Sequence, residues 1–172
     1  MAGTYVSTLV QAPAEEVWAL IGDFHRLGEW HPGLPPSTAG NELHGNAIGS
    51  IRVFEFNGVV LRETLLAYDA EGRSHTYGFP DGTFALVGYR ATLRLAPVTE
   101  LGASFVEWSA VFDVDPQQRE ESTALVQGVF TTGLAALRER FARQEGRPPP
   151  FPSYSAPPPL RQDPREPSQW PT

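Results

Sequence analysis

Apolar and polar residues alternate along six stretches of the chain, and this period of two is typical of β-strands. The six stretches are residues 4–10, 48–56, 59–68, 74–79, 85–95 and 104–114, and residues 38–43 add a shorter seventh. Turn sequences separate several of them, with Asn-Gly at 57–58, Asp-Ala-Glu-Gly at 69–72 and Pro-Asp-Gly at 80–82. The pattern therefore predicts a run of antiparallel strands.

Helical periodicity flanks these strands. Residues 13–21 and 23–30 predict two short helices after the first strand, the second of them ended by a His-Pro pair. Residues 116–144 predict one long helix with Asp115 as its N-cap. Apolar positions recur along it at spacings of three and four, namely Val126, Phe130, Gly133, Leu137 and Phe141. This order of elements predicts an α+β fold.

The Asn-Gly turn at 57–58 fixes the register of the hairpin that contains it. Counting outward from the turn pairs Arg52 with Glu63, on the face that also carries Phe54 and Leu61. An ion pair on an otherwise apolar face is costly unless its charges are paired or used. Two interpretations remain open: a structural bridge that braces the sheet, or part of a ligand site.

The same alternation assigns further residues to the inner face of the sheet. Those with polar groups are His75, Tyr77 and Tyr89, and the large apolar ones include Trp108 and Phe112. A mainly apolar surface with a few polar groups is typical of a small-molecule cavity. We therefore expect such a cavity between the sheet and the long helix.

Composition and charge narrow the function. The formal net charge of -7 disfavours nucleic acid or an anionic membrane as partner. The chain has no Cys for disulfides or thiolate chemistry and no Lys for a Schiff base, and its four His lack zinc-type spacing. We therefore expect no metal and no cofactor. Without a leader-like start or a long apolar run, the expected location is cytoplasmic.

The composition changes abruptly at Gly146, after which the chain holds ten of its seventeen prolines. This divides the chain into a predicted domain of residues 1–145 and a Pro-rich tail of residues 146–172. The tail is expected to be solvated. The alternative is a strap that docks through its large apolar residues, namely Phe151, Tyr154, Leu160 and Trp170.

Six segments resemble a known family in their order and spacing. They are APAEEVWALIGDFHRLGEWHP, GSIRVF, LRETLLAYD, YRATLRLAP, VEWSAVF and GLAALRERF. Together they resemble the START-related SRPBCC helix-grip superfamily in its polyketide cyclase/dehydratase-like branch. The resemblance covers about residues 4–144 and leaves the tail unexplained.

The resemblance implies a seven-stranded antiparallel sheet wrapped around the long C-terminal helix, with a ligand cavity between them. It places Arg52 in the Gly-x-x-Arg position and Glu63 after the turn, and it makes Trp30 and Trp108 pocket lining. The superfamily includes cyclases, dehydratases, lipid carriers and receptors, so the fold alone does not fix the function. The catalytic lysine of its alkaloid-condensing members has no counterpart here.

A cyclase or dehydratase needs a proton carrier and a hydrogen-bond donor for the oxygen that becomes negative. We assign Arg52 as a donor, Glu63 or His75 as proton carrier, and Tyr77 or Tyr89 as hydrogen-bond partner of a carbonyl. If Arg52 binds Glu63, then His75 is the better carrier, because imidazole titrates near neutrality. The alternative for His75 is an ordinary strand residue with its ring toward solvent.

The remaining predicted residues bind the substrate. They are Trp30, His31, Phe54, Leu61, Tyr89, Trp108, Phe112, Val126 and Phe130. His31 is expected at the cavity mouth, or alternatively on the surface as a loop histidine.

The function expected from these features is a polyketide cyclase/dehydratase-like enzyme of secondary metabolism. Its partner is a small hydrophobic or aromatic molecule that carries a carbonyl, and the protein is a monomer or homodimer. The main alternative is a non-catalytic carrier or sensor of such a ligand. A third possibility is an interaction module whose working part is the tail.

Overall fold

A computed structural model describes residues 1–80 and 86–143 of the chain. The strands are β1 (Ala2–Val10), β2 (Thr38–Ala39), β3 (Ile51–Phe56), β4 (Val59–Asp69), β5 (Ser74–Gly78), β6 (Val87–Val98) and β7 (Ala103–Asp113). The α-helices are α1 (Ala14–Ile21), α2 (Leu27–Trp30) and α3 (Arg119–Arg143), and the 3-10 turns are η1 (Phe24–Arg26) and η3 (Thr99–Leu101).

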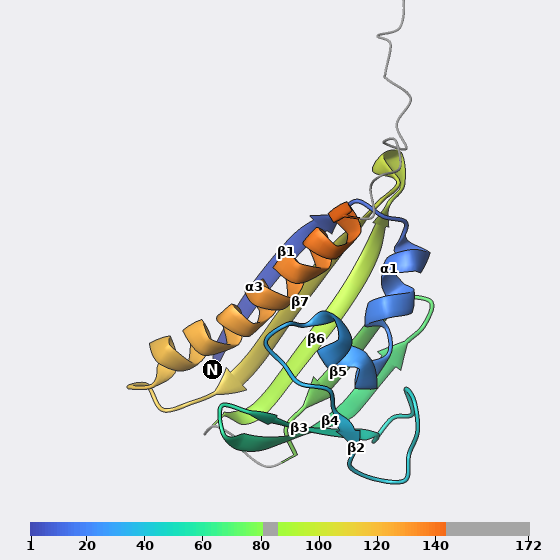
Figure 1. Cartoon of the computed structure of the whole chain (residues 1–172). Helices are drawn as coiled ribbons and strands as arrows, with labels where there is room; N and C mark the ends of the chain where they lie inside the picture. The colour runs from blue at the N-terminus through green and yellow to red at the C-terminus, as the bar shows by residue number, and fades with distance from the viewer. Residues whose placement is uncertain (81–85, 144–172) are drawn as a thin grey trace, which may run out of the picture.

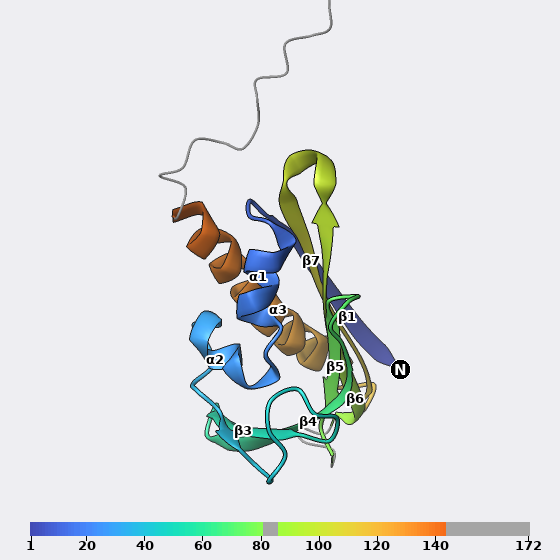
Figure 2. The ribbon, with the colours of Figure 1, turned by 90° about the vertical axis from the view of Figure 1, so that its right-hand side faces the viewer.

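The strands form one antiparallel sheet in the order β1-β7-β6-β5-β4-β3-β2. Helix α3 lies along one face of this sheet, beside β1 and β7 (Figure 1). Figure 2 shows α1 and α2 on the same face, while β3 and β4 curl beneath them. The sheet thus holds the long helix in its concave side, which confirms the predicted α+β helix-grip fold with two short helices after the first strand.

The hairpin has the register predicted from its turn. Arg52 lies opposite Glu63 in the β3–β4 ladder. Asn57 and Gly58 have φ angles of 51° and 75°, as a tight hairpin turn of this twist requires. Phe54, Arg52 and Glu63 are buried on the inner face, whereas Val59 beside the turn is 39% exposed. Alternation therefore predicted the inner face of the hairpin correctly except at its tip.

The apolar stripe of α3 forms the core together with β7. All five predicted stripe positions are buried. The ring of Phe130 stacks on Trp108 with centroids 4.4 Å apart. Gly133 gives the room for this packing, since a Cβ there would lie 3.0 Å from Trp108 and 2.5 Å from His31. Phe130 and Trp108 thus form a closely packed contact between the helix and the sheet.

Local side-chain hydrogen bonds account for the elements that differ from the prediction. The Asp115 side chain accepts from the backbone N–H of Gln117, and its backbone carbonyl accepts from that of Gln118, which forms a turn before α3 starts at residue 119. Asn41 bonds to the backbone of Gly49 and Ile51, and β2 ends before it. These polar side chains compete with regular backbone pairing.

Three predictions concern residues outside the described ranges. These are the central part of the turn at 80–82, the start of the strand at residue 85, and the division of the chain at residue 146. They stay predictions.

Candidate functional site

A mainly apolar cavity lies between α3, the β3–β4 hairpin and strands β5 to β7. It holds about 50 Å³ in which the centre of a water molecule fits, and about 500 Å³ of empty space when its open mouth is counted. The smaller figure corresponds to a few water molecules. A ligand with one or two rings would therefore have to use the mouth or displace side chains of the wall.

Eight predicted site residues line this cavity, namely Phe54, Leu61, Glu63, Tyr77, Tyr89, Trp108, Val126 and Phe130. Five others do not line it: Trp30, His31, Arg52, His75 and Phe112. The lining also includes residues that the sequence analysis missed. Leu125 and Val129 each come one position before a residue of the predicted stripe of α3, so helical spacing alone could have found them. Leu34 comes from the loop after α2, which no periodicity marks.

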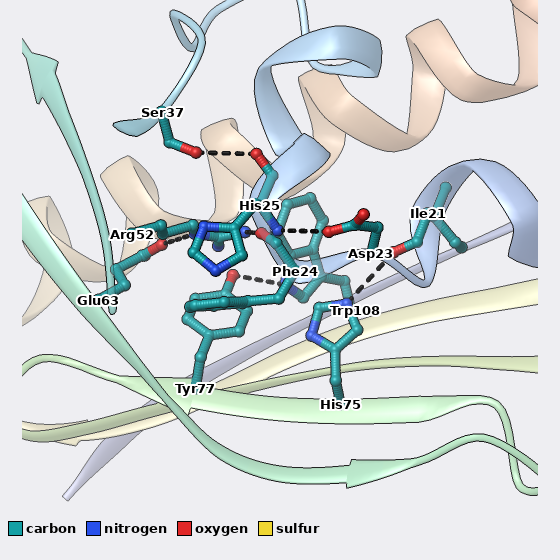
Figure 3. Close-up of polar contacts among 10 residues, drawn as sticks. All are labelled: Ile21, Asp23, Phe24, His25, Ser37, Arg52, Glu63, His75, Tyr77 and Trp108. Atoms are coloured by element: carbon teal, nitrogen blue, oxygen red, sulfur yellow. Dashed lines mark hydrogen bonds and ion pairs between the residues drawn. The ribbon is translucent and has the colours of Figure 1, made fainter. Parts of the chain in front are cut away.

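Arg52 reaches Phe24 of η1 with its guanidinium (Figure 3) and is not among the residues that line the cavity. Its Nε lies 2.5 Å from Glu63 Oε2, and its Nη1 donates to the backbone carbonyl of Phe24 at 2.5 Å. The guanidinium carbon lies 4.3 Å from the Phe24 ring centre and 4.6 Å from that of Tyr77. Two rings, a carbonyl and a carboxylate thus hold Arg52 between η1 and the sheet, where it is 1% exposed.

Glu63 connects this buried cluster to the cavity. Its carboxylate binds Arg52 and its side chain lines the cavity wall. Burial raises the pKa of Glu63, and the contact with Arg52 opposes this rise without cancelling it. Arg52 thus favours the ionised form of Glu63, as expected, but burial has the larger effect and the net direction of the pKa is upward.

Tyr77 offers a hydroxyl proton at the same wall. Trp108 Nε1 donates to Tyr77 Oη at 3.0 Å, so the Tyr77 proton remains available to another acceptor (Figure 3). Burial raises the pKa of Tyr77 strongly, and Glu63 adds to the rise. Burial likewise raises the pKa of Tyr89 well above its usual value. Both phenols are therefore neutral donors at physiological pH.

His75 belongs to the packed layer beneath α1, and its ring does not reach solvent. It is 3% exposed, and its Nε2 donates to the carbonyl of Ile21 at 3.3 Å. Burial, with a smaller contribution from the charge of Arg52, lowers the pKa of His75 to about 3. The alternative of a ring toward solvent is therefore wrong, and the lowered pKa disfavours His75 as the proton carrier.

His31 joins the segment after α2 to the middle of α3. Its Nε2 lies 2.8 Å from the carbonyl oxygen of Val129, and its Nδ1 accepts from the backbone N–H of Gly33. These two contacts fix the tautomer with the proton on Nε2. The side chain is buried, so the alternative of a surface histidine is wrong.

Trp30 and Phe112 are buried in the surrounding core. The rings of Trp30 and Trp108 have centroids 5.6 Å apart, and those of Phe112 and Tyr89 are 6.1 Å apart. Both residues therefore support the residues that line the cavity. Over residues 1–80 and 86–143, no three His, Cys, Asp or Glu side chains gather as metal ligands would. No helix in the same residues is long and apolar enough to cross a membrane.

The chain is similar to a known protein family and to several solved structures. Residues 1–142 match the family model described as polyketide cyclase / dehydrase and lipid transport. A solved structure from Thermobifida fusca is 35% identical with a TM-score of 0.76, over 84% of this chain and 96% of its own. Protein XoxI from Bacillus cereus is 31% identical with a TM-score of 0.75, over 84% of this chain and 99% of its own.

A more distant structure shares the fold alone. The di-domain ARO/CYC BexL from the BE-7585A biosynthetic pathway is 18% identical with a TM-score of 0.67. The match covers 86% of this chain and 48% of that one. No curated protein matches the sequence significantly.

Proposed function

The chain belongs to the polyketide cyclase/dehydrase and lipid transport family, and from this premise we propose that it is a cyclase or dehydratase of secondary metabolism. Its substrate is a small, largely apolar molecule with carbonyl groups. The observation that supports this proposal is the meeting of one carboxylate and one phenol, Glu63 and Tyr77, at the wall of an apolar cavity.

In this proposal Glu63 moves the proton and Tyr77 stabilises the oxygen. The carboxylate removes a proton from the carbon next to a carbonyl, and the Tyr77 hydroxyl donates to the enolate oxygen that results. The enolate carbon then bonds to a second carbonyl carbon of the same molecule, and the proton on Glu63 passes to the new alkoxide. Removal of a second proton by Glu63 and loss of the hydroxyl with that proton as water completes a dehydration.

Arg52 and the apolar wall have supporting roles. Arg52 binds Glu63 and does not line the cavity, so in this proposal it acts as a positioning residue that orients Glu63. The rings of Phe54, Trp108 and Phe130 hold the chain of the substrate in the folded shape that cyclisation needs. His75 has no part in the proton transfer, because its pKa lies far below neutrality.

A carrier of a hydrophobic ligand is the second candidate, since the family description also names lipid transport. Both candidates use the same cavity, and they differ in turnover. A carrier would bind an apolar ligand and return it unchanged. The narrow cavity suits either role.

Turnover of a neutral diketone tests the proposal. The protein is incubated with heptane-2,6-dione, and formation of the cyclic enone is followed by its ultraviolet absorbance. We expect a rate above that of buffer, and we expect Tyr77→Phe to lower it by about 10²- to 10³-fold through loss of the oxyanion donor. Tyr5→Phe, which changes a 54% exposed phenol on β1, is the matched control and leaves the rate unchanged.

Two results would contradict the enzyme proposal. One is binding of the diketone with no turnover above buffer, which points to the carrier. The other is an equal rate for the natural protein and Tyr77→Phe, which removes the phenol from the mechanism.

A further inference from the structure

Of the two charges near the cavity, the negative one lies in its wall and the positive one does not. Among the described residues that line it, Glu63 carries a formal charge and no Arg or His contributes to the wall. The nearest opposite charge is that of Arg52, which lies against the ring faces of Phe24 and Tyr77, binds Glu63 and the Phe24 carbonyl, and is not part of the lining. A molecule in the cavity therefore meets a carboxylate and neutral phenols, and it does not meet the guanidinium.

This arrangement treats neutral and anionic ligands differently. A hydroxyl or enol can donate to the Glu63 carboxylate, and a carbonyl can accept from Tyr77. A ligand carboxylate can also accept from Tyr77, but it brings a second negative charge into an apolar space beside Glu63. Two carboxylates that share a site cannot easily both be ionised. The remaining wall is apolar and cannot solvate the added charge.

We propose that the cavity selects its ligand by charge: it takes neutral hydroxy-aromatic or enolic molecules and excludes carboxylates of the same size. This inference rests on the proposed function only in placing the ligand in this cavity. It narrows the substrate to a molecule whose carboxyl groups are absent, esterified or otherwise neutral. Free fatty acids, which are apolar but anionic, are excluded by the same argument.

A matched pair of ligands tests this selection. Isothermal titration calorimetry at neutral pH compares 2-naphthol with 2-naphthoate, which have the same ring system and differ in charge. We expect 2-naphthol to bind at least tenfold more tightly, a difference of about 1.4 kcal/mol. Equal or tighter binding of 2-naphthoate overturns the proposal, and so does binding of neither ligand.

Two variants locate the source of the selection. Glu63→Gln removes the charge from the wall while keeping its shape, so binding of 2-naphthoate is expected to strengthen at least fivefold and that of 2-naphthol to weaken. Glu55→Gln removes the same charge from an exposed position of β3 and is expected to change neither affinity. Equal effects of the two variants on 2-naphthoate would overturn the assignment to Glu63. Should Glu63→Gln fail to fold, the two affinities of the natural protein still decide.

The experiment separates this inference from the proposed reaction. Selection for 2-naphthol without turnover of heptane-2,6-dione would end the enzyme proposal and leave charge selection intact. Turnover of the diketone together with equal affinities for both naphthalene ligands would end the charge-selection proposal and leave the enzyme proposal intact.

Discussion

Arg52 and Glu63 form one ion pair, but the two residues face different parts of the molecule. Arg52 is enclosed by η1 and the ring of Tyr77, and Glu63 reaches the cavity wall. An Arg side chain cannot lose its charge when its partner is removed, whereas a buried Glu can take up a proton. The fold should therefore tolerate the loss of Arg52 better than the loss of Glu63.

This asymmetry leads to a stability prediction. We expect Glu63→Leu to lower the free energy of unfolding by about 3–5 kcal/mol, because it leaves the Arg52 charge buried and unpaired. Arg52→Met is expected to cost less, since Glu63 then becomes protonated. The double variant Arg52→Met/Glu63→Leu should recover most of the loss. Urea unfolding measures all three, and a double variant no more stable than Glu63→Leu would contradict the account.

His75 predicts a pH dependence of stability. Its pKa is about 3 in the folded protein, below its ordinary value of 6.5, so between these values the unfolded chain holds a proton that the folded chain lacks. The free energy of unfolding therefore falls as pH decreases from about 6.5, with a contribution from His75 of up to about 1.4 kcal/mol per pH unit. His75→Phe should flatten this dependence in urea unfolding at pH 7, 6 and 5. An unchanged slope would show that His75 titrates normally.

The pairing of these residues could be predicted from the sequence, but their surroundings could not. The pairing of Arg52 with Glu63 follows from the hairpin turn alone, because strand alternation is local. The direction of Arg52 depends on Phe24, which lies 28 positions earlier and meets it only in the folded chain. The burial that lowers the pKa of His75 likewise comes from α1 and η1 packing over the sheet.

At the scale of elements, one glycine of α3 allows the helix to approach Trp108 of β7 closely. Gly133 faces His31 and Trp108, and a Cβ would lie within 3.0 Å of both side chains. His31 in turn binds the Val129 carbonyl on the same helix, so this contact also joins the segment after α2 to α3. Both Val129 and Trp108 line the cavity, and the position of its wall follows from this packing.

Two glycines of α3 allow a matched test. Gly133→Ala is expected to lower the free energy of unfolding by about 1–3 kcal/mol through overpacking, although alanine favours helix. Gly128→Ala, at a position with nothing within 4 Å of the added Cβ, should raise it by about 0.5–1 kcal/mol. Chemical denaturation measures the free energy of unfolding of both variants. Equal stability of the two would show that the Gly133 contact is not tight.

Elements with a regular pattern were predictable, including the short β5 and α1, whereas irregular segments were not. The five longest strands and α3 start or end within a few residues of their predicted bounds. The predicted helix at 23–30 is a 3-10 turn followed by four helical residues, because the Asp23 side chain accepts from the backbone of His25. The irregularity of β4 between Leu65 and Ala67 had no signal in the sequence, and it sets which residues lie opposite His75.

At the scale of the whole molecule, the described residues form a sheet that closes over α3. Between the two lies a cavity with a few polar groups in its wall. The fold class followed from the order of strands and helices, since an amphipathic sheet and an amphipathic helix can bury their apolar faces only against each other. The volume of the cavity did not follow, because it depends on how side chains from strands β3 to β7, from α2 and the loop after it, and from α3 fill the space between them.

The Pro-rich composition after residue 146 leads to a prediction for the whole chain. A chain that ends at Gly146 should keep the melting temperature of the full protein, because a solvated tail adds nothing to the folded state. Differential scanning calorimetry compares the two chains under identical conditions. A fall of several degrees on truncation would favour the strap.

In the proposed mechanism Glu63 carries the proton in the cavity, and Arg52 holds Glu63 in position. The most direct test is the rate of diketone cyclisation by two variants that each lose one carboxylate. Glu63→Gln, confirmed as folded by circular dichroism, should turn over heptane-2,6-dione about 10²- to 10⁴-fold more slowly than the natural protein. Glu55→Gln, on the exposed face of β3, should match the natural protein. A Glu63→Gln rate equal to that of Glu55→Gln would contradict the claim.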